Sequence, residues 1–140
     1  MIRILFACVH NAGRSQMAAA LFNQLADPSL AQAISAGTDP ATQIHPEVLS
    51  VMREVGIELD GVTPRLLTAE LASQANILVT MDCGETCPVV PGLKREDWNL
   101  PDPKGQPPEH VRQIRDEIRK RVREMVKANG WGKKQATGGF

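Results

Sequence analysis

Short apolar runs alternate along this chain with segments whose apolar residues recur at helical spacing. The runs 2–7, 31–36 and 76–81 have the composition of buried strands, and 98–100 is a candidate for a short last strand. Helical segments are expected at 15–26, 46–55, from 68 onward and at 109–127. Because strands that alternate with helices form parallel sheets covered on both faces, the sequence predicts an α/β fold. We expect three layers, αβα, around a small central parallel sheet of about four strands.

The length of 140 residues suits one domain that can bury a core of its own. The sequence contains no internal repeat and no composition typical of a linker. We therefore expect a single domain over 1–128. The Gly- and Lys-rich end, 129–140, is expected to form a flexible C-terminal tail.

Charge and cysteine content narrow the classes of partner. Sixteen basic residues balance sixteen acidic ones, which argues against attraction to nucleic acid or to an anionic membrane surface. No apolar run approaches the roughly 20 residues that cross a bilayer, and no export signal is evident. Three cysteines do not suit a secreted disulfide framework, so we expect thiols in a reducing cytoplasm.

A loop that could bind an oxyanion follows the first apolar run. In open α/β sheets, ligands bind where strands end, and a loop entering a helix there directs N–H groups at an anion. Arg14 can hold a tetrahedral oxyanion, and the same positive field favours the thiolate of Cys8. The spacing between Cys8 and Arg14 alone is equally consistent with a buried, inert thiol and a surface arginine. The candidate oxyanion-binding residues are Val9, His10, Asn11, Ala12, Gly13 and Arg14.

Residues 8–18, read Cys-Val-His-Asn-Ala-Gly-Arg-Ser-Gln-Met-Ala, resemble the arsenate reductases built on the low-molecular-weight tyrosine phosphatase fold. The phosphatases themselves usually have Pro after Arg-Ser, where this chain has Gln16 and Met17. Further matches lie at 35–38, 45–46, 78–81 and 98–103, and in the loop that carries Cys83 and Cys87. The resemblance spans roughly 1–126. It implies a phosphotyrosine phosphatase I-like fold, arsenate reductase activity and a role in arsenic detoxification.

The resemblance also assigns roles to individual residues. Cys8 matches the nucleophile, Arg14 the clamp on the oxyanion, and Ser15 the hydroxyl that supports the thiolate. Asn11 matches a polar residue that braces the loop. Asp102, followed by Pro103, matches the general acid that protonates a leaving oxygen. The oxyanions implied are arsenate, phosphate and sulfate.

Cys83 and Cys87 lie four residues apart in a loop and can pair with each other or exchange with a third thiol. The strand before Cys83 should lie near the first strand, so Cys83 could approach Cys8. A disulfide there requires the two Cα atoms to be within about 7 Å. Two alternatives are passive loop thiols and a zinc site, although Cys-x3-Cys without a nearby His suits zinc poorly. We therefore expect no metal.

The resemblance implies a relay through all three cysteines. Cys8 attacks arsenate, Cys83 attacks Cys8 and releases arsenite, and Cys87 then forms a redox-active disulfide with Cys83. Thioredoxin, an external protein, would reduce that disulfide, so no bound cofactor is expected. Some relatives instead use mycothiol or glutathione with a glutaredoxin-like partner, and this alternative stays open.

Two departures from the family pattern matter. Several thioredoxin-linked relatives place the last two cysteines farther apart than Cys83 and Cys87. Many carry Glu, which contributes to a potassium site beside the loop, where this chain has Ala19. The second departure puts a bound potassium ion in doubt, though not the catalysis.

Three classes of function follow. The first is an arsenate reductase, which the two additional cysteines favour. The second is a phosphatase acting on aryl phosphates through Cys8, Arg14 and Asp102, which would form a phosphocysteine and need no Cys83. The third is a non-enzymatic thiol sensor or oxyanion-binding regulator, which would form disulfides without turnover.

Overall fold

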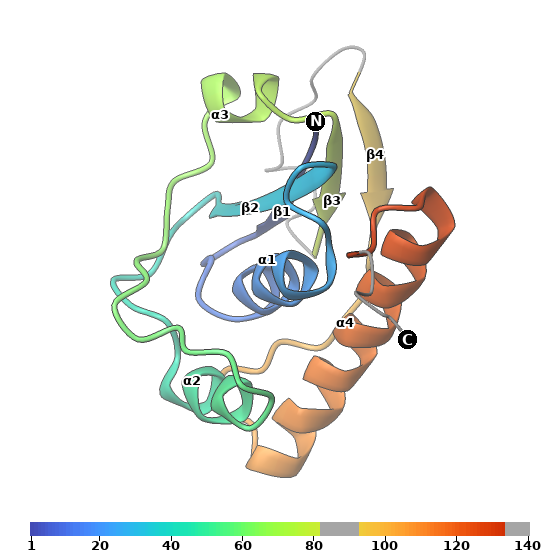
Figure 1. Ribbon diagram of the computed structural model, residues 1–140. Helices are drawn as coiled ribbons and strands as arrows, with labels where there is room; N and C mark the ends of the chain where they lie inside the picture. The colour runs from blue at the N-terminus through green and yellow to red at the C-terminus, as the bar shows by residue number, and fades with distance from the viewer. Residues whose placement is uncertain (82–92, 134–140) are drawn as a thin grey trace, which may run out of the picture.

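The computed structural model describes residues 1–81 and 93–133. Within these ranges the elements in chain order are β1 (Ile2–Cys8), α1 (Arg14–Leu25), β2 (Ala31–Gly37), α2 (Pro46–Arg53), α3 (Ala69–Ser73), β3 (Ile77–Thr80), β4 (Lys94–Asp97) and α4 (Pro108–Asn129). The strands form one parallel sheet in the order β2-β1-β3-β4. Figure 1 shows α1, α2 and α4 on one side of this sheet and α3 on the other. The predicted α/β fold with an αβα arrangement is confirmed.

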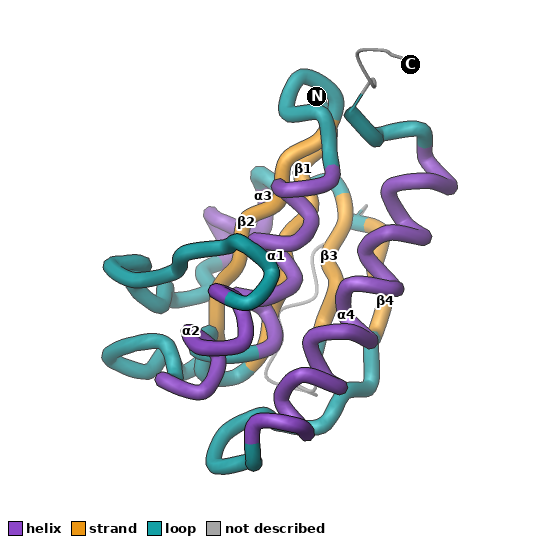
Figure 2. The backbone as a smooth tube through the Cα atoms, turned by 60° about the horizontal axis from the view of Figure 1, so that its bottom comes forward, coloured by secondary structure: helices purple, strands orange, loops and turns teal. Residues whose placement is uncertain are grey.

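The two faces of β1 bury different clusters because successive side chains of a strand point to opposite faces. Ile4 and Phe6 belong to the larger cluster, which packs against α1, α2 and α4. Leu5 and Ala7 belong to a smaller cluster on the face of α3. All four side chains are fully buried. Figure 2 shows α1 and α4 side by side in front of the strands. Residues of both helices belong to the larger cluster.

The last strand differs from the prediction. The strand is the charged run Lys94–Asp97. The predicted strand 98–100 lies outside any assigned strand, although Trp98 N–H still donates to the Thr80 carbonyl at 2.8 Å. β4 pairs with β3 through its backbone, so its side chains need not be apolar at this edge of the sheet. Trp98 and Leu100 are apolar because they are buried beyond the strand, where the Trp98 ring packs 5.5 Å from that of Phe6.

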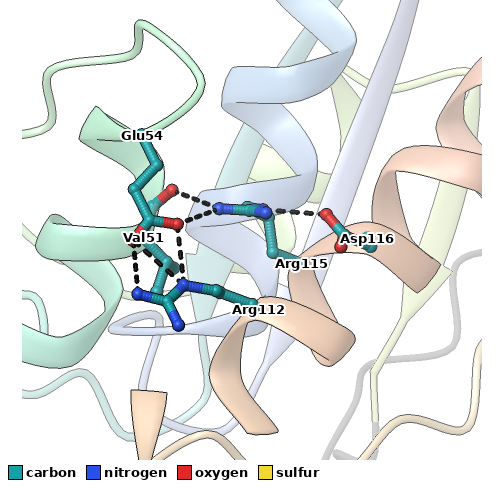
Figure 3. A network of polar contacts seen from close by, with 5 residues as sticks. All are labelled: Val51, Glu54, Arg112, Arg115 and Asp116. Atoms are coloured by element: carbon teal, nitrogen blue, oxygen red, sulfur yellow. Dashed lines mark hydrogen bonds and ion pairs between the residues drawn. The ribbon is translucent and has the colours of Figure 1, made fainter. Parts of the chain in front are cut away.

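A cluster of charged side chains joins α2 to α4 (Figure 3). Arg115 is only 8% exposed and donates hydrogen bonds of 2.8 Å to the Val51 carbonyl and to the Glu54 carboxylate. Arg112 holds the same carboxylate at 2.8 Å. Hydrogen bonds from Arg112 and then Arg115 lower the pKa of Glu54 to about 2. The first turns of α4 are thereby fixed against the end of α2.

The chain beyond α4 packs against the C-terminal end of α1 as far as residue 133. Gly130 ends the helix with a φ of 69°, and Trp131 turns back to place its ring 6.0 Å from that of Phe22. Asp27 N–H donates to the Trp131 carbonyl at 2.7 Å. The tail expected from residue 129 therefore begins with a packed segment, and 134–140 lie outside the described residues. No helix in the described ranges has the length and apolar character required to cross a membrane.

Candidate active site

Cys8 stands at the carboxyl end of β1. From β1 the chain leads to β2 on one side, and β3 lies on the other, so Cys8 is at the point where the strand order reverses. Open α/β sheets bind ligands at this point. Cys8 is a free thiol and 2% exposed. The loop after it enters α1 through Gly13, which places the positive end of this helix beside the sulfur.

Hydrogen bonds converge on the Cys8 sulfur. Asn11 N–H donates to Sγ at 3.3 Å, and the Ser15 hydroxyl lies 2.9 Å from it. Asn11 Nδ2 donates to Ser15 Oγ at 2.7 Å, which leaves the hydroxyl proton of Ser15 for the sulfur. Donors of this kind stabilise a thiolate. The predicted residues Cys8, Asn11 and Ser15 are therefore in direct contact.

Asn11 is held in one orientation by its surroundings. It is fully buried and has a φ of 51°, in the left-handed region. Its Oδ1 accepts from the Arg65 backbone N–H at 2.8 Å, and because a backbone N–H can only donate, this contact identifies the oxygen. Gln16 Nε2 donates to the same Oδ1 and to the Asn11 carbonyl, each at 3.0 Å. Gln16 and Arg65 were not predicted as site residues.

The carbonyl groups of the loop accept hydrogen bonds from the surrounding chain. Thr38 N–H donates to Cys8 O, Asp39 N–H to Val9 O, Ala41 N–H to His10 O and His45 N–H to Ala12 O, at 2.8–3.2 Å. The Asn11 carbonyl is bound by Gln16. With five consecutive carbonyls turned to these donors, the N–H side of the loop is left for an anion.

Two glycines allow the close packing around this loop. A Cβ on Gly37 would lie 2.5 Å from Val9 O and 2.8 Å from Asn11 N. A Cβ on Gly13 would lie 2.8 Å from Cγ of Pro103. Gly13 was predicted as part of the loop. The contact made by Gly37 was missed, because its neighbours come from another strand end.

Arg14 joins the loop to the segment after β4. It is 6% exposed, and its Nη1 donates to the Leu100 carbonyl at 2.9 Å. Asp102 follows on the same segment, is exposed, and accepts from Lys104 N–H at 3.0 Å. Pro103 packs on Gly13, so the segment of Asp102 reaches the rim of the loop.

Two histidines also border the loop. His10 Nδ1 lies 3.0 Å from the Asp39 carbonyl. Burial lowers the pKa of His45, against opposing effects of Glu47 and Asp102. The neutral imidazole of His45 is therefore favoured beside the oxyanion loop.

Cys83 and Cys87 lie outside the described residues. The strand that leads to them is described, and it runs beside β1, with Thr80 opposite Ala7. Met81 N–H donates to the Ala7 carbonyl at 2.7 Å. The chain therefore passes next to Cys8 two residues before Cys83.

The residues beside the loop do not fit a potassium ion. Ala19 is buried and offers no side-chain oxygen, and both oxygens of Asn11 already accept hydrogen bonds. A nearby cavity of about 220 Å³ is bordered by Gln16, Ala19, Ser35, Thr63 and Arg65 among others, and none of the described residues lining it is Asp or Glu. Residues 1–81 and 93–133 contain no cluster of three His, Cys, Asp or Glu side chains that could hold a metal.

Comparison with known proteins gives a consistent result. The family model for low molecular weight phosphotyrosine protein phosphatase matches residues 3–135. A protein from Halobacterium salinarum is 38% identical over 121 residues, 84% of this chain and 85% of that protein. An arsenate reductase from Staphylococcus aureus (strain Newman) is 35% identical over 120 residues, 83% of this chain and 89% of the relative.

A solved structure extends the comparison to three dimensions. The thioredoxin-dependent arsenate reductase of Corynebacterium glutamicum superposes with a TM-score of 0.79 at 39% identity. The match covers 91% of this chain and 61% of that chain, so this chain spans about three fifths of its length.

Proposed function

Because this chain belongs to the low molecular weight phosphotyrosine protein phosphatase family, we propose that it is an arsenate reductase whose nucleophile is Cys8. The observation that carries the proposal is the set of donors around the Cys8 sulfur, next to the strand that leads to Cys83. The arsenate reductases among its relatives support the choice of substrate. We assign the reaction to the cytoplasm, where thiols are kept reduced.

In the first step arsenate binds to the N–H side of the loop and to the Arg14 guanidinium. The Cys8 thiolate attacks arsenic, a sulfur–arsenic bond forms, and one arsenic–oxygen bond breaks. Asp102, on the segment that reaches the rim, donates the proton that lets this oxygen leave as water. Arsenic stays in the +5 state through this step.

Reduction occurs in the second step. The Cys83 thiolate attacks Cys8 Sγ, a disulfide forms, and the electron pair of the sulfur–arsenic bond passes to arsenic. Arsenic is reduced from +5 to +3 and leaves as arsenite. The two cysteines have together lost two electrons. Ser15 and Asn11 stabilise the Cys8 sulfur as a thiolate, the form in which it starts the cycle and is released at its end.

The last step moves the disulfide away from Cys8. The Cys87 thiolate attacks Cys83, which releases the Cys8 thiolate and forms the Cys83–Cys87 disulfide. A dithiol protein, thioredoxin, reduces this bond by supplying two electrons and two protons. The Corynebacterium relative, which is thioredoxin-dependent by name, supports this reductant. Mycothiol or glutathione with a glutaredoxin-like protein is the alternative route.

A phosphatase is the second candidate, favoured by the family model itself. It would use Cys8, Arg14 and Asp102 on a phosphate ester, and it would not require Cys83 or Cys87. The same loop suits both substrates, because arsenate and phosphate are tetrahedral oxyanions of the same charge.

The test is arsenate-dependent oxidation of NADPH in the presence of thioredoxin and thioredoxin reductase. We expect turnover by the natural chain and none by Cys8→Ser. Cys87→Ser should complete one turnover, because it can still form the Cys8–Cys83 disulfide, and then stop. Equal steady-state rates for the natural chain and Cys87→Ser would refute the relay. Hydrolysis of an aryl phosphate without arsenate reduction by any thiol would establish the phosphatase instead.

A further inference from the structure

The amide of Gln16 is a buried polar group to which the reaction above gives no role. Gln16 lies in the first turn of α1 and is 5% exposed. Its Nε2 donates to two oxygens of one residue, the carbonyl and Oδ1 of Asn11, each at 3.0 Å. Both contacts are buried, and a buried hydrogen bond that is lost leaves its partners unsatisfied. Asn11 is therefore the only residue that the Gln16 amide nitrogen is seen to bind in the described part of the chain.

The contact of Gln16 Nε2 with Oδ1, together with that of the Arg65 N–H, sets which way the Asn11 amide faces. With Oδ1 toward Gln16 and the Arg65 N–H, Nδ2 faces Ser15 and donates to its hydroxyl. The opposite orientation would place an NH₂ group against two donors. It would also turn Oδ1 toward Ser15, which would then direct its hydroxyl proton at Asn11 and away from the Cys8 sulfur.

The contact with the Asn11 carbonyl acts on the backbone. Asn11 holds a left-handed conformation with a φ of 51°, a sparsely populated region that Asn adopts more readily than most side chains. In this conformation its N–H reaches Cys8 Sγ at 3.3 Å. A donor bound to the carbonyl of the same residue helps to keep the peptide in place.

We propose that Gln16 is a positioning residue that keeps both Asn11-dependent donors directed at Cys8. It does so with an amide nitrogen that binds both oxygens of Asn11, the carbonyl and Oδ1, so that no cation is needed to bridge them. The reactivity of Cys8 is thereby independent of potassium. The inference concerns the site of the proposed function, but it requires only that Cys8 react as a thiolate.

The test measures alkylation of Cys8 by iodoacetamide as a function of pH. It uses the full chain with Cys83→Ser and Cys87→Ser, so that Cys8 is the one remaining thiol among three. In this background we compare Gln16→Leu, which removes the donor, and Gln16→Glu, which replaces it with an acceptor of the same size. Gln24→Glu is the matched control, since Gln24 is exposed on the same helix.

We expect the pH profile of both Gln16 variants to move to higher pH by about one unit, with a rate up to about tenfold lower below the midpoint. The plateau at high pH should stay unchanged, because the chain remains folded and only the thiolate is destabilised. Potassium chloride should restore the profile of Gln16→Glu, but not that of Gln16→Leu. Gln24→Glu should match the parent.

Three results would overturn the inference. They are a Gln16→Leu profile equal to that of the parent, a lower plateau without a shift, and a parent profile that changes when sodium replaces potassium. Arsenate turnover is measured separately on chains with all three cysteines. A shifted profile without arsenate reduction would leave this inference standing and remove the proposed function. Arsenate reduction with an unshifted profile would do the reverse.

Discussion

Replacement of Gly37 by alanine should disturb the nucleophile without altering any chemical group of the site. Gly37 ends β2, where its N–H donates to Arg65 O and its carbonyl accepts from Leu67 N–H, at 2.8 and 2.7 Å. These bonds leave it little freedom to move. An added Cβ would lie 2.5 Å from Val9 O, 2.8 Å from Asn11 N and 3.0 Å from Asn11 Cβ. All three are atoms of the oxyanion loop or attached directly to its backbone.

The displacement follows from these distances. An ordinary contact of 3.4 Å requires the loop and β2 to separate by roughly 0.9 Å at Val9 O. The Asn11 N–H now lies 3.3 Å from Cys8 Sγ, and a shift of this size would take it beyond hydrogen-bond range. Overpacking costs about 1–3 kcal/mol of stability. A lost hydrogen bond to a charged group costs about 1.5–3 kcal/mol, which is roughly a tenfold to hundredfold loss of thiolate.

The assay is the alkylation rate of Cys8 at neutral pH, together with thermal unfolding and the arsenate-dependent rate. Gly132→Ala is the matched control, because a Cβ there would meet Val126 at an ordinary 3.7 Å. We expect Gly37→Ala to lose at least tenfold in alkylation rate and Gly132→Ala to lose none. A Gly37→Ala chain that alkylates and turns over like the parent would show that the loop does not depend on this close contact.

Three further predictions concern charge. Since the pKa of Glu54 is held at about 2 against a usual 4.5, its carboxylate stabilises the fold above pH 4.5, and this contribution is lost as pH falls toward 2. The unfolding temperature of Glu54→Gln should therefore change less than that of the parent over this pH range. Burial lowers the pKa of His45 below 6.5, so the unfolded chain takes up the proton first and the free energy of unfolding falls as pH drops through and below 6.5. His45→Gln should flatten that part of the curve of stability against pH. An unchanged slope would contradict the assignment. Arg14→Lys keeps the charge but loses the planar fork, so kcat/KM for arsenate should fall roughly tenfold to hundredfold, and a steady-state comparison with the parent measures it.

The order of strands and helices could be predicted because apolar periodicity is a local property. The run that became β1 is buried on both faces, and such runs are evident in a sequence. β4 could not be found in this way, because the edge position of Lys94–Asp97 permits charged side chains and only its backbone pairs with β3. The strand was instead predicted at Trp98 and Leu100 because they are apolar. They are apolar because they are buried in the core beyond β4, not because they belong to a strand.

The functional site shows the same difference between features that are local in sequence and features that depend on the fold. Cys8, Asn11, Arg14 and Ser15 lie within eight residues, so their proximity was implicit in one motif. The support given by Gly37 comes from the end of another strand and depends on backbone register, which no local pattern reveals. Gln16 was within the motif, but its partner is determined by the left-handed conformation of Asn11. The parts played by Cys83 and Cys87 stay predictions.

The charged composition of β4 has a consequence for the behaviour of the protein at high concentration. Within residues 1–81 and 93–133, β4 pairs on one side only, so its other side presents backbone groups that a second chain could extend into a larger sheet. Two basic and two acidic side chains, Lys94, Arg95, Glu96 and Asp97, follow one another along this edge. An apolar strand that paired with this edge would strip these charges of water, and charged side chains on an exposed edge strand discourage such pairing. The charged composition that made β4 hard to predict from the sequence thus also disfavours aggregation through this edge of the sheet.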